Sequence, residues 1–350
     1  MTPAELRSLI AFQRDTFRLF GPTKKCTHPD SKIARAATKN RLGNNANNTL
    51  NDQHIFIHAK QNVSSLEELE VYEMKQLNSY LLRIKKSGWR LNEHFRQSTI
   101  NGCTTHKCFS ATTIDSQHVP LAPSVTQILE ATKSERDRNI LRQWRQRKLS
   151  EFDSFSAFMD YLQDIKKRGS TFHNKLCQYF TNKDNIIEIP NVLADEAQNG
   201  LLKSFKAVAS YFPRPSILNE QYVCHKHLNY SGRIDCLLSP ILHEKALFNY
   251  QLPFNNKLVL VDWKTTDSKV KHTILDCYDY PVQLAAYLGA LKSTYSPDKY
   301  DIADRAILAF IYCNGSKCTL FRLNEIQMDY YWQTWLQRLI KFSKLLEQCE

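Results

Sequence analysis

Apolar residues recur at helical spacing in several stretches of this 350-residue chain, most clearly after Pro123. Pro123 and Ser124 indicate a helix start, because a serine hydroxyl can cap the first turn of a helix. The pattern predicts helices over residues 65–86, 135–149, 151–180, 281–291 and 328–346.

Between the later helices, short apolar or alternating runs predict β-strands. The expected strands cover residues 222–228, 232–238, 258–263, 306–312 and 318–323. Asn314-Gly315 is a strong hairpin signal between the last two strands, and Lys257-Leu-Val-Leu-Val261 is typical of a fully buried strand. Residues 239–256 contain two prolines and are expected to form an insertion loop. Strands mixed with helices predict an α/β core.

The N-terminal part of the chain has a different character. Residues 26–118 are expected to be variable and partly disordered, and the asparagine-rich stretch Asn40–Asp52 is typical of a flexible linker. In residues 1–25, apolar and basic residues alternate as in an amphipathic mitochondrial presequence. Glu5 and Asp15 count against that interpretation, and an ordinary N-terminal helix is the alternative.

Composition narrows the class of protein. Lysine and arginine number 47 against 35 acidic residues, and the net charge of +12 favours a polyanionic partner or an anionic membrane surface. Glycine is scarce and no glycine-rich phosphate loop is present. Ten cysteines without a Cys-x-x-Cys pair are typical of reduced thiols in an intracellular protein. No apolar run reaches the about 18 residues of a membrane span, so we expect no stable membrane insertion.

Two acids and a lysine stand at the ends of strand-like runs. Asp262-Trp263-Lys264 directly follows the buried run, and Asp235 ends the run Ser231–Ile234. Two carboxylates and a lysine held at strand tips can bind a hard divalent cation and direct a water molecule at a phosphodiester. Asp-x-Lys also occurs at residues 30–32, 164–166 and 267–269, where we expect surface ion pairs. Because only the copy at 262 follows a buried strand, it is the predicted catalytic centre.

The predicted helix over residues 135–149 is strongly basic. Arg138, Arg142 and Arg145 share one face of this helix, and Trp144 lies beside them. Such arginines could follow the phosphates of a nucleic acid while the indole stacks an unpaired base. The alternative is a solvated basic face with Trp144 anchored in the core.

The motifs Asp262-Trp-Lys-Thr265 and Gln283-Leu-Ala-Ala-Tyr-Leu-Gly-Ala290 occur in a fixed order with other short stretches. The further stretches are Ser124-Val-Thr126, Leu141–Arg147, Phe172-His173, Leu228-Asn-Tyr230 and Ile234-Asp-Cys236. Together, over residues 120–345, they resemble the mitochondrial genome maintenance exonuclease family, in the RecB-like branch of the PD-(D/E)xK nuclease superfamily. The chain departs from this pattern at residues 239–256, where its relatives have a shorter loop.

The resemblance implies a restriction-endonuclease-like core, which is a mixed central sheet flanked by helices, with an N-terminal helical region. It also implies a Mg²⁺ or Mn²⁺ cofactor bound by Asp235, Asp262, His173 and the backbone carbonyl of Trp263, with Asp235, Asp262 and Lys264 catalytic. Gln283 and Tyr287 would contact phosphate or support the ligands, although Tyr287 could equally be core packing; Glu220, expected just before the first strand, would have a metal or supporting role. The implied DNA contacts are Ser124, Thr126, Arg138, Arg142, Trp144 and Arg145.

The implied activity is a metal-dependent exonuclease that cleaves single-stranded DNA from free ends or flaps during mitochondrial DNA replication and maintenance. The expected protein is a mitochondrial monomer that could meet replication proteins. We expect a nuclease domain over 119–350, made of a basic helical part at 123–180 and a catalytic core at 217–346. The alternatives are a RecB-like repair nuclease outside mitochondria and an inactive module that binds single-stranded DNA.

Overall fold

The computed structural model describes residues 49–91, 122–181, 196–239, 257–267 and 270–349. The chain divides into two compact units, residues 1–60 and residues 61–350. Within the first unit, only residues 49–60, which begin a helix, are described, and every side-chain contact given below lies in the second unit. The predicted presequence and most of the predicted insertion loop lie outside the described residues.

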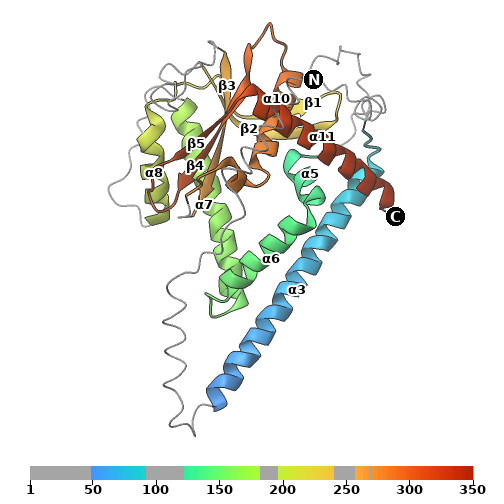
Figure 1. The fold of residues 1–350 in the computed structure, drawn as a ribbon, viewed down its shortest axis with the longest axis vertical. Coiled ribbons are helices and arrows are strands. Elements are labelled where there is room, and N and C mark those ends of the chain that lie inside the picture. The colour runs from blue at the N-terminus through green and yellow to red at the C-terminus, as the bar shows by residue number, and fades with distance from the viewer. Residues whose placement is uncertain (1–48, 92–121, 182–195, 240–256, 268–269, 350) are drawn as a thin grey trace, which may run out of the picture. The chain divides into compact units, whose positions relative to one another are not determined.

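A five-stranded mixed sheet forms the centre of the second unit (Figure 1). The strands stand in chain order and are β1 Leu218–His225, β2 Tyr230–Leu238, β3 Leu258–Thr266, β4 Ile302–Tyr312 and β5 Thr319–Leu323. Neighbouring strands are antiparallel except β3 and β4, which are parallel. A parallel pair requires a crossover connection, and here the connection contains the 3-10 helix η1 Ile274–Cys277 and the helix α10 Tyr280–Thr294. The expected mixed α/β sheet is therefore confirmed.

Two apolar clusters cover the two faces of the sheet. The larger cluster joins α10, α5 (Val125–Thr132), α11 (Glu325–Gln348) and the C-terminal end of α3 (Thr49–Lys86) to one face. The second cluster joins α7 (Phe155–Thr181) and α8 (Glu196–Ala209) to the opposite face. The side chains of β3 alternate between the two clusters. Leu260 lies in the first cluster, and Val261 and Trp263, the residues before and after Asp262, lie in the second. This alternation, with period two, directs Asp262 and Lys264 toward the α10 side.

Local sequence signals position several helices as expected. The helix α6 covers Glu135–Leu149, with the bounds that the sequence predicts. Ser124 caps α5, because its hydroxyl accepts a hydrogen bond from the backbone N–H of Gln127 at 3.3 Å. α7 begins at Phe155 rather than at residue 151, and the hydroxyl of Ser154 accepts the Ala157 N–H at its start.

Other elements differ from the expected bounds. α3 begins at Thr49 instead of residue 65, so the end of the predicted linker is helical; extending a helix costs little once one part has formed. β1 covers Leu218–His225 instead of 222–228. The strand ends early because Asn229 has a left-handed φ of 52° and closes a tight turn onto His225 O at 2.9 Å. The helix α8 was not predicted from the sequence. Within it, Gly200 lies so close to the backbone of Cys313 that a Cβ at position 200 would collide with it.

Among the described residues, every helix is either too short or too polar to cross a lipid bilayer.

Candidate active site

The site begins where β2 and β3 stop pairing. Their ladder ends at Cys236 and Val261, one step before Asp235 and Asp262 would stand opposite each other. In place of the next backbone bond, Oδ2 of Asp235 accepts the backbone N–H of Trp263 at 2.6 Å. This bond fixes the Asp235 carboxylate in the opening between the two strands.

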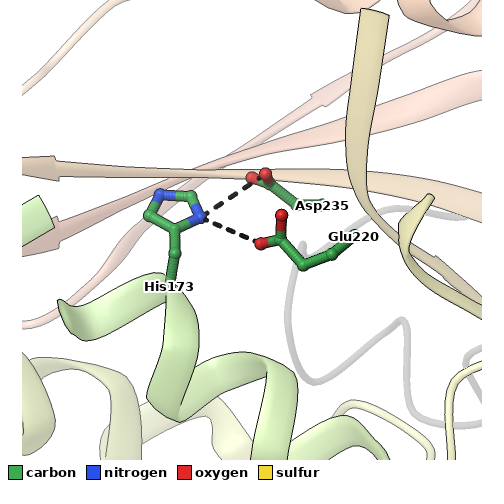
Figure 2. Close-up of side chains that lie close together, drawn as sticks. All are labelled: His173, Glu220 and Asp235. Carbon is green, nitrogen blue, oxygen red and sulfur yellow. Dashed lines mark ion pairs between the residues drawn. The ribbon is translucent and has the colours of Figure 1, made fainter. Parts of the chain in front are cut away.

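Three potential metal ligands converge at this opening, as Figure 2 shows. Nδ1 of His173, on α7, lies 3.4 Å from Oδ1 of Asp235 and 3.7 Å from Oε1 of Glu220. One ligand atom from each of the three residues lies within 4.8 Å of the other two. A helix and two strands thus present one nitrogen and two carboxylates at a single point.

Glu220 lies inside β1, which corrects the expectation that it precedes the first strand. Its φ of 48° falls in the left-handed region that non-glycine residues rarely adopt. The β1–β2 register continues on both sides, so Glu220 stands at the level of Asp235. The unusual backbone interrupts the regular alternation of β1 at the point where the carboxylate reaches His173. Such local strain is often found at functional sites.

Asp262 and Lys264 form the second half of the site. Asp262 is 1% exposed, and its Oδ2 lies 2.7 Å from Nζ of Lys264. In the described part of the chain, Oδ1 of Asp262 has no hydrogen-bond partner, whereas Oδ2 faces the ammonium of Lys264, so the carboxylate is only partly satisfied. A buried carboxylate in this state is costly unless a further cation or donor binds it.

The ionisation of these groups reflects burial and mutual charge. Burial raises the pKa of Asp262 to about 6, even though Lys264 opposes the shift. Burial acts to raise the pKa of Asp235 as well, but hydrogen bonding and charge from His173 outweigh it and lower the pKa. Burial disfavours protonated His173, yet Asp235 and Glu220 raise its pKa to about 10. The carboxylates therefore draw positive charge into the opening.

The donor set fits a hard divalent cation. The unpartnered Oδ1 of Asp262 and the converging carboxylates of Asp235 and Glu220 are oxygen ligands, which Mg²⁺ and Mn²⁺ prefer, and His173 adds a nitrogen. The backbone N–H of Trp263 supports Asp235, while its indole donates to Cys236 Sγ at 3.3 Å. A ligand role for the Trp263 carbonyl stays a prediction.

Gln283 and Tyr287 lie on α10, one turn apart and buried. Nε2 of Gln283 donates to the hydroxyl of Tyr287 at 2.9 Å. The Tyr287 ring lies against Gly232, where a Cβ would come within 2.5 Å of the ring. Burial raises the pKa of Tyr287 to about 12, although the charge of Lys264 lowers it. Tyr287 is thus a core residue whose pKa also depends on the charge of Lys264.

The arginines of α6 have partners on α3. Arg142 Nε lies 2.8 Å from Glu70, and Arg145 forms two hydrogen bonds to Glu73 at 2.7 and 2.8 Å. Arg138 points the same way and donates to the sulfur of Met74 at 3.5 Å. The basic face is therefore largely neutralised by α3. Its role as a DNA contact stays a prediction, as does that of Trp144, which is half-buried.

Ser124 and Thr126 lie at the start of α5, with their hydroxyls 3.2 Å apart. Ser124 also forms an isolated parallel bridge with Ser231, on the strand that carries Asp235. Their backbone positions are therefore tied to β2, and their part in DNA binding stays a prediction.

Sequence reasoning missed Arg233, which lies two residues before Asp235. Its Nη2 pairs with Oε2 of Glu220 at 2.6 Å, although the side chain is 64% exposed. The i, i+2 spacing from Asp235 along a strand was the available signal, because such residues share a face of the sheet.

The fold and this cluster together define an α/β protein with a carboxylate-rich, lysine-containing centre. No family model matches the chain. The chain is 27% identical over 231 residues to the Xenopus tropicalis protein named Mitochondrial genome maintenance exonuclease 1, which covers 65% of this chain and 59% of that protein. The human and mouse proteins of the same name are each 26% identical over 224 residues, covering 63% of this chain and 58% and 59% of theirs.

The chain is therefore similar in sequence to members of the mitochondrial genome maintenance exonuclease family, as the motifs implied. It spans somewhat less than two thirds of the length of the curated relatives it matches. The solved structure titled "Crystal structure of SSO0001" aligns over 73% of this chain and 86% of its own, with 13% identity and a TM-score of 0.27.

Proposed function

We propose that this chain is a nuclease that uses Mg²⁺ or Mn²⁺ to hydrolyse single-stranded DNA from free ends or flaps in mitochondrial DNA maintenance. The observation that carries the proposal is the convergence of His173, Glu220 and Asp235 beside the buried Asp262–Lys264 pair. The names of the relatives support nuclease activity, DNA as substrate and the expected mitochondrial location. We further propose membership of the PD-(D/E)xK superfamily, with a nuclease domain over 119–350.

The residues that would hold the cation are Asp235, Asp262 and His173, with Glu220 as a fourth side chain. When bound, the cation would polarise the phosphoryl oxygen and lower the pKa of a bound water. Asp262 is suited to this set because it is buried and its Oδ1 has no partner among the described residues.

Lys264 would act directly on the substrate. Its ammonium is held in place by Asp262 and stays protonated, because the charges of Asp262 and Asp235 outweigh burial and raise its pKa. A fixed ammonium can orient the attacking water and stabilise the charge that develops on the phosphoryl oxygens. Gln283 and Tyr287 would support this geometry from α10.

A cleavage assay tests the proposal. Purified protein is incubated with end-labelled linear single-stranded DNA, circular single-stranded DNA, duplex DNA and RNA, each with Mg²⁺, Mn²⁺ or a chelator. We expect linear single strands to be degraded, circles to survive and the chelator to stop the reaction. Cleavage of circles would contradict the exonuclease assignment, and binding without cleavage would favour an inactive DNA-binding module.

Matched variants make the assay specific to this site. Asp235→Asn and Asp262→Asn should each abolish cleavage, whereas Asp267→Asn, in the neighbouring Asp-x-Lys copy, should leave it intact. Imaging a tagged chain with and without residues 1–25 tests the predicted presequence separately.

A further inference from the structure

Two exposed tyrosines lie at the start of α10: Tyr280 is its first residue and lies beside Lys264, and Tyr278 precedes it by two residues. Tyr278 is 63% exposed and Tyr280 is 37% exposed. The ring centroid of Tyr280 lies 5.0 Å from Nζ of Lys264 and 5.8 Å from the ring of Phe310, which pairs with Lys264 across β3 and β4. A partly exposed aromatic ring thus adjoins the lysine of the active site, with the ammonium over the ring.

The backbone around these tyrosines is firmly anchored. Asp279, between them, accepts a hydrogen bond from Arg338 of α11 at 2.7 Å, and its carbonyl accepts the Gln283 N–H at 2.9 Å. Cys277, on the other side of Tyr278, is fully buried. Tyr278 itself has a φ of 49° and a ψ of −128°, an unfavourable conformation for a residue with a side chain. The segment therefore holds two large apolar rings at the surface instead of burying them.

We propose that Tyr280, with Tyr278 next to it, is a stacking platform for unpaired bases of the DNA strand whose phosphate reaches Lys264. This inference rests on the proposed nuclease function and extends it by naming where the bases bind. A phosphate drawn to the ammonium carries its own nucleoside, and Tyr280 is the aromatic face next to that ammonium. Base faces are accessible for such stacking only when the strand is unpaired.

A stacking platform at Tyr280 would account for a preference for single-stranded DNA without a contribution from the basic face of α6. On α6 the arginines beside Trp144 are engaged by Glu70 and Glu73, whereas the ring of Tyr280 lies directly against the catalytic lysine. Stacking is tolerant of sequence, because every base presents an aromatic face. We therefore expect little base preference at this position.

The test combines protein variants with abasic substrates. Cleavage of linear oligonucleotides that carry one abasic nucleotide at successive positions from the end is compared with cleavage of intact strands, using wild type, Tyr280→Phe and Tyr280→Leu. Tyr280→Leu should lower kcat/KM on intact DNA by roughly 5- to 140-fold, which corresponds to about 1–3 kcal/mol for one stacked base, and Tyr280→Phe, which keeps the ring, should lose far less. One abasic position should reduce wild-type cleavage equally and have no further effect on Tyr280→Leu.

Each other outcome overturns the platform. If Tyr280→Leu loses activity equally on intact and abasic strands, the ring only positions Lys264. If no abasic position affects wild-type cleavage, no base is stacked; this comparison does not depend on whether a variant folds. If wild type cleaves no DNA, the proposed function fails, and fluorescence anisotropy of oligo-dT against an abasic oligomer still tests the platform. In that case, equal affinities would overturn it.

Discussion

Two cationic regions of this molecule differ in what surrounds their charges. Lys264 is nearly buried and faces an almost fully buried carboxylate, whereas Arg142 on α6 is half-exposed and pairs with a partly exposed Glu70. Charges interact more strongly away from water, and exposed pairs contribute little. Both regions contain positive charge, yet the carboxylate partner is itself buried only in the first, since Glu70 and Glu73 are partly exposed. Burial and partners, more than charge, separate a reaction centre from a basic surface.

The largest expected effect is the loss of the Lys264 charge. Lys264→Met should lower the rate of cleavage by about 10²–10³-fold, because a fixed donor to the developing phosphoryl charge is removed. DNA affinity should change far less, since one charge among many is lost. Lys257→Met, at the other end of β3, is the matched control, because Lys257 pairs with Asp301 away from the site. Single-turnover kinetics and filter binding measure the two quantities.

A Lys264→Met protein that cleaves at the wild-type rate would remove this residue from the chemistry. An equal loss in Lys257→Met would show that the effect comes from general charge and not from position.

The next effect concerns Glu220, whose carboxylate contacts both His173 and Arg233. His173 would share a bound cation with Glu220, whereas Arg233 competes with that cation for the carboxylate. If Glu220 ligates the cation, Glu220→Gln should weaken Mn²⁺ binding by about 10- to 100-fold, as for other changes to a metal environment. Arg233→Gln removes the competing cation and should leave Mn²⁺ affinity equal or higher. Isothermal titration of both variants measures the difference. A loss of affinity in Arg233→Gln with none in Glu220→Gln would reverse these assignments.

For the ion pairs between α6 and α3, we expect a modest effect on the free energy of unfolding. A double-mutant cycle on Arg145 and Glu73 should give a coupling free energy of about 0.5–1 kcal/mol, because the pair is bidentate and the arginine is largely buried. The more exposed Arg142–Glu70 pair is the control and should couple less. Urea unfolding of the single and double variants measures both. If Arg145→Gln instead weakens DNA binding and lowers its salt dependence, the predicted nucleic-acid role of α6 would stand.

Much of the fold and part of the site follow from local sequence. The apolar run before Asp262 predicted a buried strand, and Ser124 marked the start of α5. Such features depend on neighbours within a few residues, which a pattern can show. The expected end of that strand at residue 263 is wrong, because β3 continues to Thr266 and the Asp-Trp-Lys triplet lies within it, paired with β4. Asp235 was predicted as a site residue from the strand-like run that precedes it. The antiparallel register of β2 and β3 brings Asp235 level with Asp262.

Other features depend on contacts between distant residues. Arg142 and Glu70 are 72 positions apart, so helical spacing alone could not reveal that the basic face meets α3. Glu220 was expected outside the strand because Leu218-Asn-Glu-Gln221 does not alternate apolar and polar residues; its left-handed φ, which lets the strand include it, is visible only in the structure. Tyr280 shows no sign of its exposure in the sequence, because an aromatic residue in a first helical turn is usually buried.

The smallest expected effect concerns Asp276, an exposed acid that organises the segment before Tyr278. Partial burial acts to raise the pKa of Asp276, but hydrogen bonds from the backbone N–H groups of Thr273 and His272 outweigh it and lower the pKa. When the pKa of an acid is lower in the folded state than in the unfolded state, the acid stabilises the protein at pH values above its unfolded-state pKa. This contribution is lost as the pH falls through the folded-state pKa.

Asp276→Asn should therefore reduce the free energy of unfolding by less than about 1 kcal/mol at neutral pH. The difference from wild type should shrink only as the pH falls below the ordinary carboxylate value of about 4 and through the lowered pKa of the folded state, where the carboxylate becomes neutral in both states. Urea unfolding between pH 7 and pH 3 measures it, with Asp298→Asn, an exposed change in another turn, as the control. A difference that stays constant with pH would mean that the side-chain shape of Asp276, and not its charge, supports the segment that carries the two tyrosines.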